Sequence, residues 1–255
     1  MCYDETSVAP TAPGDRVAVT ANDVTLTAAG GTRFAAFEAA PAAPEHTRAA
    51  QVLLLPDVNG LYDFYRQLAQ RVAETGHRTI AIDYFGRTAG PGPREPGFDR
   101  QEHLARLSRD HQSADVAAAI AHLRATADGP VFTMGFCLGG SVSLLAGVQQ
   151  AEVAGVIAFY AWTGGRGPLV ALPDSFVTDI RCPVLGLFGE DDTAVPVEVP
   201  RAFERHLAEA GVPHDIVIYP GQGHGFFEED EMGEAGHEAA ATDAWRRVLA
   251  FLASA

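Results

Sequence analysis

Residues 131–141, VFTMGFCLGGS, constrain the fold of this chain more than any other stretch. An apolar run ends in Gly-x-Cys-x-Gly-Gly, and residues compatible with a helix follow at once. This pattern predicts a strand, a very sharp turn and a helix, because side chains at Gly135 and Gly139 would collide where strand and helix cross. Cys137 would then lie at a helix N-terminus, where the helix dipole favours a thiolate. The alternative is a buried structural cysteine in an ordinary strand-to-helix turn.

Short apolar runs alternate with helical patterns along most of the chain. Continuous apolar runs, typical of parallel strands covered on both faces, occur at residues 51–56, 79–83, 131–136, 153–159, 184–188 and 215–219. Helical spacing predicts helices at residues 62–75, 101–108, 114–126, 139–149, 199–210 and 235–252. Residues 84–98 and 160–179 are predicted to be irregular. We therefore expect an α/β fold with a mainly parallel central sheet flanked by helices.

The first part of the chain has a different pattern. Alternating apolar residues at 16–27 and 32–40, separated by Gly30–Gly31, predict an antiparallel β-hairpin. Residues 1–16 combine proline with small and charged residues and are expected to form an extended arm. No internal repeat or long linker divides the chain, so we predict a single domain over residues 1–255.

The net charge and the cysteine content indicate which classes of partner and which cellular compartment to expect. A net charge of −15 argues against nucleic acid and anionic membranes as partners. The acidic cluster at 228–231 is expected to be a solvated loop. The three cysteines, Cys2, Cys137 and Cys182, are far apart and form no Cys-x-x-Cys pair, which suits a reducing compartment. With no signal sequence or membrane-spanning run, the expected location is the cytoplasm.

Three reactive side chains follow directly after predicted parallel strands. They are Cys137, Asp192 and His224, the last between two glycines. Because the carboxyl ends of parallel strands meet at one edge of a sheet, we expect these groups to meet there. Nucleophile, acid and base also come in the chain order of α/β-hydrolases. Asp191 competes with Asp192 as the acid, and either carboxylate could instead be a helix N-cap.

These segments resemble a known family. The motifs are GFCLGG around Cys137, GEDDTAVP around Asp192 and GQGHGF around His224, and they resemble dienelactone hydrolases, also called carboxymethylenebutenolidases. The resemblance runs from about residue 51 to residue 252. It implies an α/β-hydrolase fold with a cysteine nucleophile, and it places the acid at Asp192.

The resemblance also implies the groups that support the nucleophile. Relatives carry a carboxylate, usually Glu, at the end of an earlier strand close to the thiol, and this chain has the shorter Asp57 there. The backbone N–H groups of Val58 and Leu138 would form the oxyanion hole. Read from the residues alone, Asp57 could simply cap the following helix.

At the substrate side, this chain departs from the pattern of the family. Relatives bind a substrate carboxylate with two arginines, of which Arg87 matches the first, while Glu228 stands in place of the second. Arg87 could bind an anionic substrate alone or pair with Glu228. Trp162, Phe226 and Phe227 are candidate pocket walls, although aromatic residues after strands are core residues as often.

The sequence thus predicts a Cys-His-Asp hydrolase that cleaves a lactone or small carboxylic ester. The alternatives are a general carboxylesterase or thioesterase, and a non-catalytic binding protein with the same fold. No metal site and no cofactor are implied. The expected partner is a small-molecule substrate, and the chain could be a monomer or a homodimer.

Overall fold

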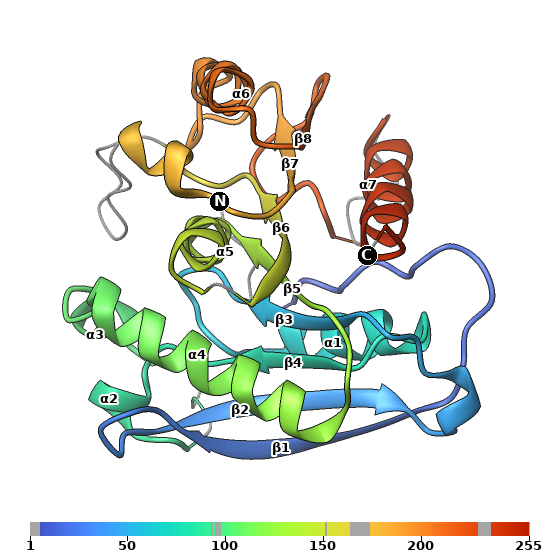
Figure 1. The fold of residues 1–255 in the computed structure, drawn as a ribbon, viewed down its shortest axis with the longest axis vertical. Coiled ribbons are helices and arrows are strands. Elements are labelled where there is room, and N and C mark those ends of the chain that lie inside the picture. Colours follow the sequence, from blue (N-terminus) through green and yellow to red (C-terminus); the bar gives the residue numbers. More distant parts are fainter. Residues whose placement is uncertain are drawn as a thin grey trace.

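The apolar runs form the strands of one eight-stranded sheet in the computed structural model, which describes residues 6–92, 94, 98–150, 152–163, 174–228 and 236–254. The strands are β1 (Val19–Thr27), β2 (Arg33–Pro41), β3 (Gln51–Leu55), β4 (Thr79–Ile82), β5 (Val131–Phe136), β6 (Val153–Phe159), β7 (Val184–Gly189) and β8 (His214–Tyr219). Their order across the sheet is β1-β2-β4-β3-β5-β6-β7-β8 (Figure 1). The predicted α/β fold with a mainly parallel sheet is confirmed.

Six strands that are neighbours in the sheet, in the order β4, β3, β5, β6, β7 and β8, run parallel. Their apolar sequences have a direct cause. In β3, Val52 and Leu54 face one hydrophobic core, while Leu53 and Leu55 face the other. Every residue of this strand is buried. A strand covered on both faces has no polar side, and for this reason its sequence is a continuous apolar run.

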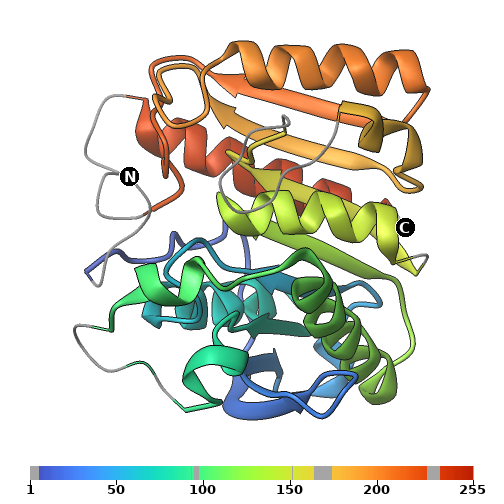
Figure 2. The ribbon, with the colours of Figure 1, turned by 90° about the vertical axis from the view of Figure 1, so that its left-hand side faces the viewer.

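The predicted hairpin is also present. Strands β1 and β2 pair antiparallel from Val19–Pro41 to Thr27–Arg33, and the turn between them uses Gly30 and Gly31 at φ +89° and +85°. Strand β2 then pairs antiparallel with β4. Figure 2 shows the hairpin (blue) at one end of the sheet and β8 (orange) at the other.

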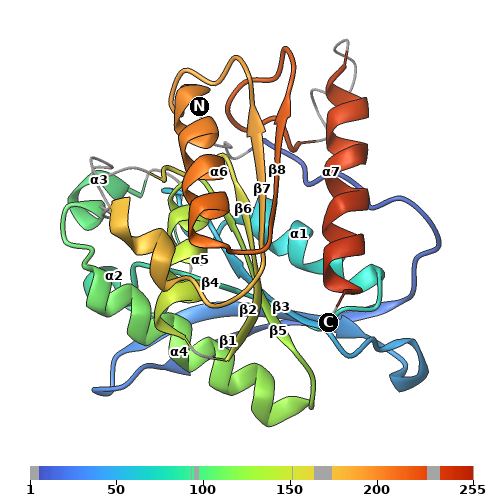
Figure 3. The ribbon, with the colours of Figure 1, turned by 45° about the horizontal axis from the view of Figure 1, so that its top comes forward.

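Helices cover both faces of the sheet. They are α1 (Asp63–Glu74), α2 (Gly86–Ala89), α3 (Arg100–Leu104), α4 (Arg109–Thr126), α5 (Leu138–Gln149), α6 (Glu198–Ala210) and α7 (His237–Leu252), with 3₁₀ turns η1 (Pro44–His46) and η2 (Asp174–Asp179). Helices α1 and α7 pack on one face, and α4, α5 and α6 pack on the other (Figure 3). No helix in the described part of the chain is both long enough and apolar enough to cross a bilayer.

Three helices differ from the sequence prediction. Helix α3 ends at Leu104, four residues before the predicted end at residue 108. Helix α2 lies inside the segment predicted to be irregular, and it is only one turn long. Helix α4 begins at Arg109, five residues before the predicted start, because Ser108 Oγ caps it by accepting from the His111 N–H at 3.3 Å. Ser108 is thus an N-cap rather than the end of a helix.

The N-terminal arm is tied to the face that carries α1 and α7. The Ala9 N–H donates to Gln67 Oε1 at 3.2 Å, and Trp245 Nε1 donates to the Pro10 carbonyl at 3.2 Å. Ala9 and Ala12 are buried in the core on this face. Cys2 and residues 229–231 of the acidic cluster lie outside the described residues.

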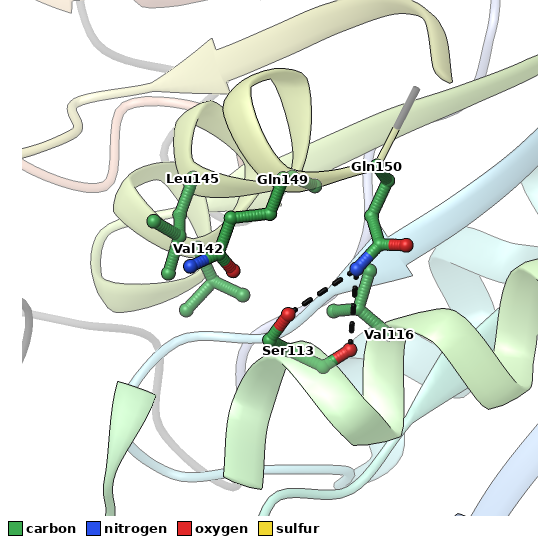
Figure 4. Close-up of a pocket in the computed structure, with 7 residues that line it drawn as sticks. Ser113, Val116, Val142, Leu145, Gln149 and Gln150 are labelled. Carbon is green, nitrogen blue, oxygen red and sulfur yellow. Dashed lines mark hydrogen bonds between the residues drawn. The ribbon is translucent and has the colours of Figure 1, made fainter. Parts of the chain in front are cut away.

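A crevice between α4 and α5 lies apart from the predicted site residues. Gln150 Nε2 crosses it to donate to Ser113, at 3.2 Å from Oγ and 3.4 Å from the carbonyl oxygen (Figure 4). The other lining side chains are mainly apolar, among them Val116, Val142 and Leu145, and no enclosed volume remains for a ligand. The crevice lies on the side of α5 that faces α4, and none of the predicted site residues lines it.

Candidate active site

Cys137 occupies the sharp turn between β5 and α5. Its backbone has φ +53° and ψ −113°, and it is one of two non-glycine residues with positive φ in the described part of the chain, Tyr160 being the other. A Cβ on Gly135 would collide with the Gly139 carbonyl, and a Cβ on Gly139 would collide with the carbonyl oxygens of Leu55 and Pro56. The glycines therefore permit the close crossing that the sequence predicted. Such strained backbone is common at functional sites.

His224 and Asp192 form a buried hydrogen bond after β8 and β7. His224 Nδ1 lies 2.8 Å from Asp192 Oδ2, and the two side chains are 4% and 1% exposed. Asp192 Oδ1 accepts the N–H groups of Ala194 and Val195 at 2.7 and 2.8 Å. One carboxylate oxygen is thus held by two backbone N–H groups, and the other is hydrogen-bonded to the imidazole. Asp191, the competing acid, is exposed.

Two residues at the end of β6 link Cys137 to the His224–Asp192 pair. The Cys137 N–H donates to the Phe159 carbonyl at 3.0 Å. The next residue, Tyr160, packs its ring against His224 with 4.7 Å between ring centroids. Strands β5 to β8 are neighbours in the sheet, so the residues that follow them share one edge. The predicted site residues Cys137, Asp192 and His224 all lie at that edge.

Asp57 lies at the same edge, after β3, and is buried. Its Oδ1 accepts the Asn59 N–H at 2.7 Å, and its Oδ2 accepts the Tyr62 hydroxyl at 3.3 Å. Helix α1 begins at Asp63 with Tyr62 as N-cap and no side-chain cap, so the alternative that Asp57 caps this helix is wrong. The carboxylate instead fixes the turn that contains Val58, which is half-buried.

The candidate aromatic walls differ in their surroundings. Phe226 and Phe227 are both buried in the core that also contains Phe136 and Phe159, so these two side chains serve packing. Trp162 is half-buried, and its carbonyl oxygen accepts the Ser141 hydroxyl at 2.8 Å.

Two buried tyrosines at this edge were missed by the sequence analysis. Tyr65 lies within the predicted helix at residues 62–75, and Tyr84 is the first residue of the segment predicted to be irregular. Burial raises the pKa of Tyr84 well above its ordinary value, and the nearby charges of Asp57, Asp83 and Cys137 raise it further. The phenol therefore stays protonated beside the thiol. Within the described residues, no group of three His, Cys, Asp or Glu side chains could hold a metal ion.

A family model described as the dienelactone hydrolase family matches residues 34–255. The chain belongs to this family. A carboxymethylenebutenolidase of Rhodococcus opacus is 34% identical over 209 residues, which cover 78% of this chain and 79% of the relative. A Salmonella typhimurium protein assigned the same activity is 28% identical over 210 residues, covering 79% and 76%.

A solved structure has the same fold. A Klebsiella pneumoniae protein assigned as a dienelactone hydrolase superposes with a TM-score of 0.79 at 24% identity, and the match covers 93% of this chain and all of that one. Membership of the dienelactone hydrolase family makes this protein a hydrolase of the class that cleaves lactones and esters.

Within this dienelactone hydrolase fold, Arg87 does not meet Glu228. Arg87 donates to Asp115 Oδ1 at 2.7 Å and to Thr32 Oγ1 at 2.5 Å. Glu228 Oε2 accepts the hydroxyl of Ser7 in the N-terminal arm at 3.0 Å. The predicted alternative of an Arg87–Glu228 pair is therefore wrong.

Asp115, the partner of Arg87, was also missed. It lies on the buried face of α4 beside Val116, where burial raises its pKa to about 6 although Arg87 opposes the shift. An acidic residue on the apolar face of a predicted helix was the available signal, because such a residue needs a partner.

Proposed function

We propose that this protein hydrolyses a lactone or small carboxylic ester with Cys137 as nucleophile, His224 as base and Asp192 as the acid that orients the base. The observation that carries the proposal is the buried His224–Asp192 hydrogen bond at the sheet edge where Cys137 begins α5. The three groups have the roles of nucleophile, base and orienting acid.

In the proposed reaction, each imidazole nitrogen has its own role. With Nδ1–H donating to Asp192, Nε2 is the nitrogen that takes the thiol proton. The Cys137 sulfur attacks the carbonyl carbon, and the C=O electron pair moves onto oxygen. When the tetrahedral intermediate collapses, the C–O bond breaks and His224 returns the proton to the leaving alkoxide. In a lactone this alcohol stays attached to the acyl group.

The second half of the reaction releases the acid. A water molecule loses a proton to His224 and attacks the thioester, the C–S bond breaks, and the proton returns to the thiolate. The backbone N–H groups of Leu138 and Val58 stabilise the oxyanion in both halves. A donor of this kind contributes about 3 kcal/mol in comparable sites. Asp57 supports the reaction by holding the turn that carries Val58.

Neutral substrates fit this site better than anionic ones. The charge of Arg87 is compensated by Asp115, and Glu228, which replaces the second arginine, bonds to Ser7. We therefore propose that Arg87 does not anchor a substrate carboxylate, and that neutral lactones and esters are preferred. Trp162 is the remaining candidate wall for the acyl group.

Turnover of p-nitrophenyl acetate tests the proposal. Iodoacetamide at pH 7.5 and the Cys137→Ala substitution should each reduce kcat/KM by more than a hundredfold. The control is Cys182→Ala, which should keep wild-type activity, because burial raises the pKa of the Cys182 thiol to about 11 and keeps it unreactive. A Cys137→Ala variant that keeps the wild-type rate would show a different nucleophile. A wild type without turnover would favour a binding protein.

A further inference from the structure

The structure assigns Tyr65 and Tyr84 as positioning residues that fix the Pro56–Asp57 peptide from its two ends, so that the neighbouring Val58 N–H is held ready for the oxyanion. This inference rests on the proposed function. It concerns two side chains that take no part in the reaction described above.

The two hydroxyls bind opposite ends of one peptide unit. Tyr84 Oη donates to the Pro56 carbonyl oxygen at 2.9 Å, and the Asp57 N–H donates to Tyr65 Oη at 2.9 Å. All partners in these two hydrogen bonds are buried. A peptide plane held at both its C=O and its N–H cannot rotate without breaking a buried hydrogen bond, and each such loss is costly.

The clamped peptide lies between the two halves of the proposed oxyanion hole. On one side, the first turn of α5 approaches so closely that a Cβ on Gly139 would collide with the Pro56 carbonyl oxygen. On the other side, the Asp57 carbonyl accepts the Gly60 N–H at 3.2 Å and closes the turn that contains Val58. The orientation of this peptide therefore sets the position of the Val58 N–H relative to the Leu138 N–H.

Tyr65 also connects this turn to the nucleophile. Its ring packs against Phe136, the residue before Cys137, with 5.6 Å between centroids in an edge-to-face arrangement. The same side chain thus contacts the strand that presents the thiol and bonds to the residue before Val58. Such fixed geometry is what makes hydrogen-bond donors effective in a transition state.

Tyr65→Phe and Tyr84→Phe test the inference, because each removes only one oxygen atom. For p-nitrophenyl acetate, we expect kcat to fall about tenfold in each variant and KM to stay within about twofold, since a loosened donor loses part of its transition-state contribution. Inhibition by 2,2,2-trifluoroacetophenone, which forms an oxyanion when the thiol adds, should weaken by about the same factor. The matched control is Tyr219→Phe, which removes a hydroxyl bonded to Asp243.

A second measurement distinguishes an effect of the variants on the oxyanion hole from an effect on the reactivity of the thiol. Alkylation of Cys137 by iodoacetamide needs a reactive thiolate but no oxyanion, so its rate between pH 6 and 9 should be unchanged in both variants. Alkylation that slows in parallel with turnover would show that the tyrosines act on the thiol, and would overturn the inference. Unchanged kcat in both variants would overturn it as well. Failure of the proposed function would instead appear as turnover by Cys137→Ala.

Discussion

At the scale of single residues, two adjacent carboxylates follow β7, and only one of them pairs with His224. Both Asp191 and Asp192 follow β7, but only Asp192 is buried, bonded to two backbone N–H groups and in contact with the imidazole. The sequence alone left Asp191 and Asp192 as candidates for the acid, and the resemblance to the family favoured Asp192. Neither Tyr65 nor Tyr84 could be found in this way, because each bonds to the Pro56–Asp57 peptide, at a separation of 8 positions for Tyr65 and 28 positions for Tyr84.

Asp192→Asn and Asp191→Asn should therefore differ strongly. The first substitution removes the charge that stabilises the imidazolium and favours the wrong tautomer of His224, so kcat should fall by roughly 10⁴-fold, as in comparable triads. The second alters an exposed carboxylate and should change kcat less than about twofold. Steady-state kinetics of both variants provides the measurement. Equal losses in the two variants, or a greater loss in Asp191→Asn, would contradict the assignment.

At the scale of elements, strands were predicted well and short helices poorly. A strand covered on both faces must be apolar throughout, so β3, β5 and β7 were visible in the sequence. Helix α2 has one turn and begins with glycine, which leaves no periodicity to detect. The start of α4 was hidden because its apolar face contains buried Gln112 and Asp115.

The contact between α5 and β3 makes Gly139 the critical residue of the turn. In Gly139→Ala, the new Cβ would collide with the Leu55 carbonyl oxygen and force the helix away from the strand. We expect a loss of about 3 kcal/mol in the free energy of unfolding, near the upper end for overpacking, and a decrease in Tm of about 6–12 °C.

Activity should decrease in the same variant by more than its stability explains, because Leu138 would move relative to Val58. Thermal unfolding and kcat, measured well below the Tm, give the two quantities. The matched control is Gly92→Ala, since a Cβ there would have no heavy atom of the described residues within 4 Å. A Gly139→Ala variant that matched this control in both measurements would contradict the proposed crossing.

At the scale of the whole molecule, we expect the net charge to influence which substrates approach the site. The chain carries a net charge of −15, so its long-range field repels anions. Close to the sheet edge, Arg87 is neutralised by Asp115. The sequence showed that Glu228 stands in place of the second arginine of the family pattern. It could not show that Ser7 of the N-terminal arm bonds to this carboxylate, because Ser7 lies 221 positions earlier in the chain.

Dienelactone and its methyl ester should therefore behave differently. We expect kcat/KM to be higher for the neutral methyl ester. Raising the salt concentration from about 0.01 to 0.5 M should increase kcat/KM for the dienelactone anion several-fold and leave the ester nearly unchanged, because salt screens the repulsion. A wild type that prefers the anion at low salt would contradict this account of substrate choice.

As the proposed nucleophile, Cys137 should become acylated during turnover, and mass spectrometry of the quenched enzyme measures this acylation. Wild-type protein mixed with p-nitrophenyl acetate and quenched with acid during the initial burst should carry one acetyl group on the peptide that contains Cys137. The thioester should disappear on treatment with neutral hydroxylamine. Cys137→Ala should carry no acetyl group on this peptide and show no burst. An acetyl group on another side chain during a kinetically competent burst, with Cys137 unmodified, would contradict the account.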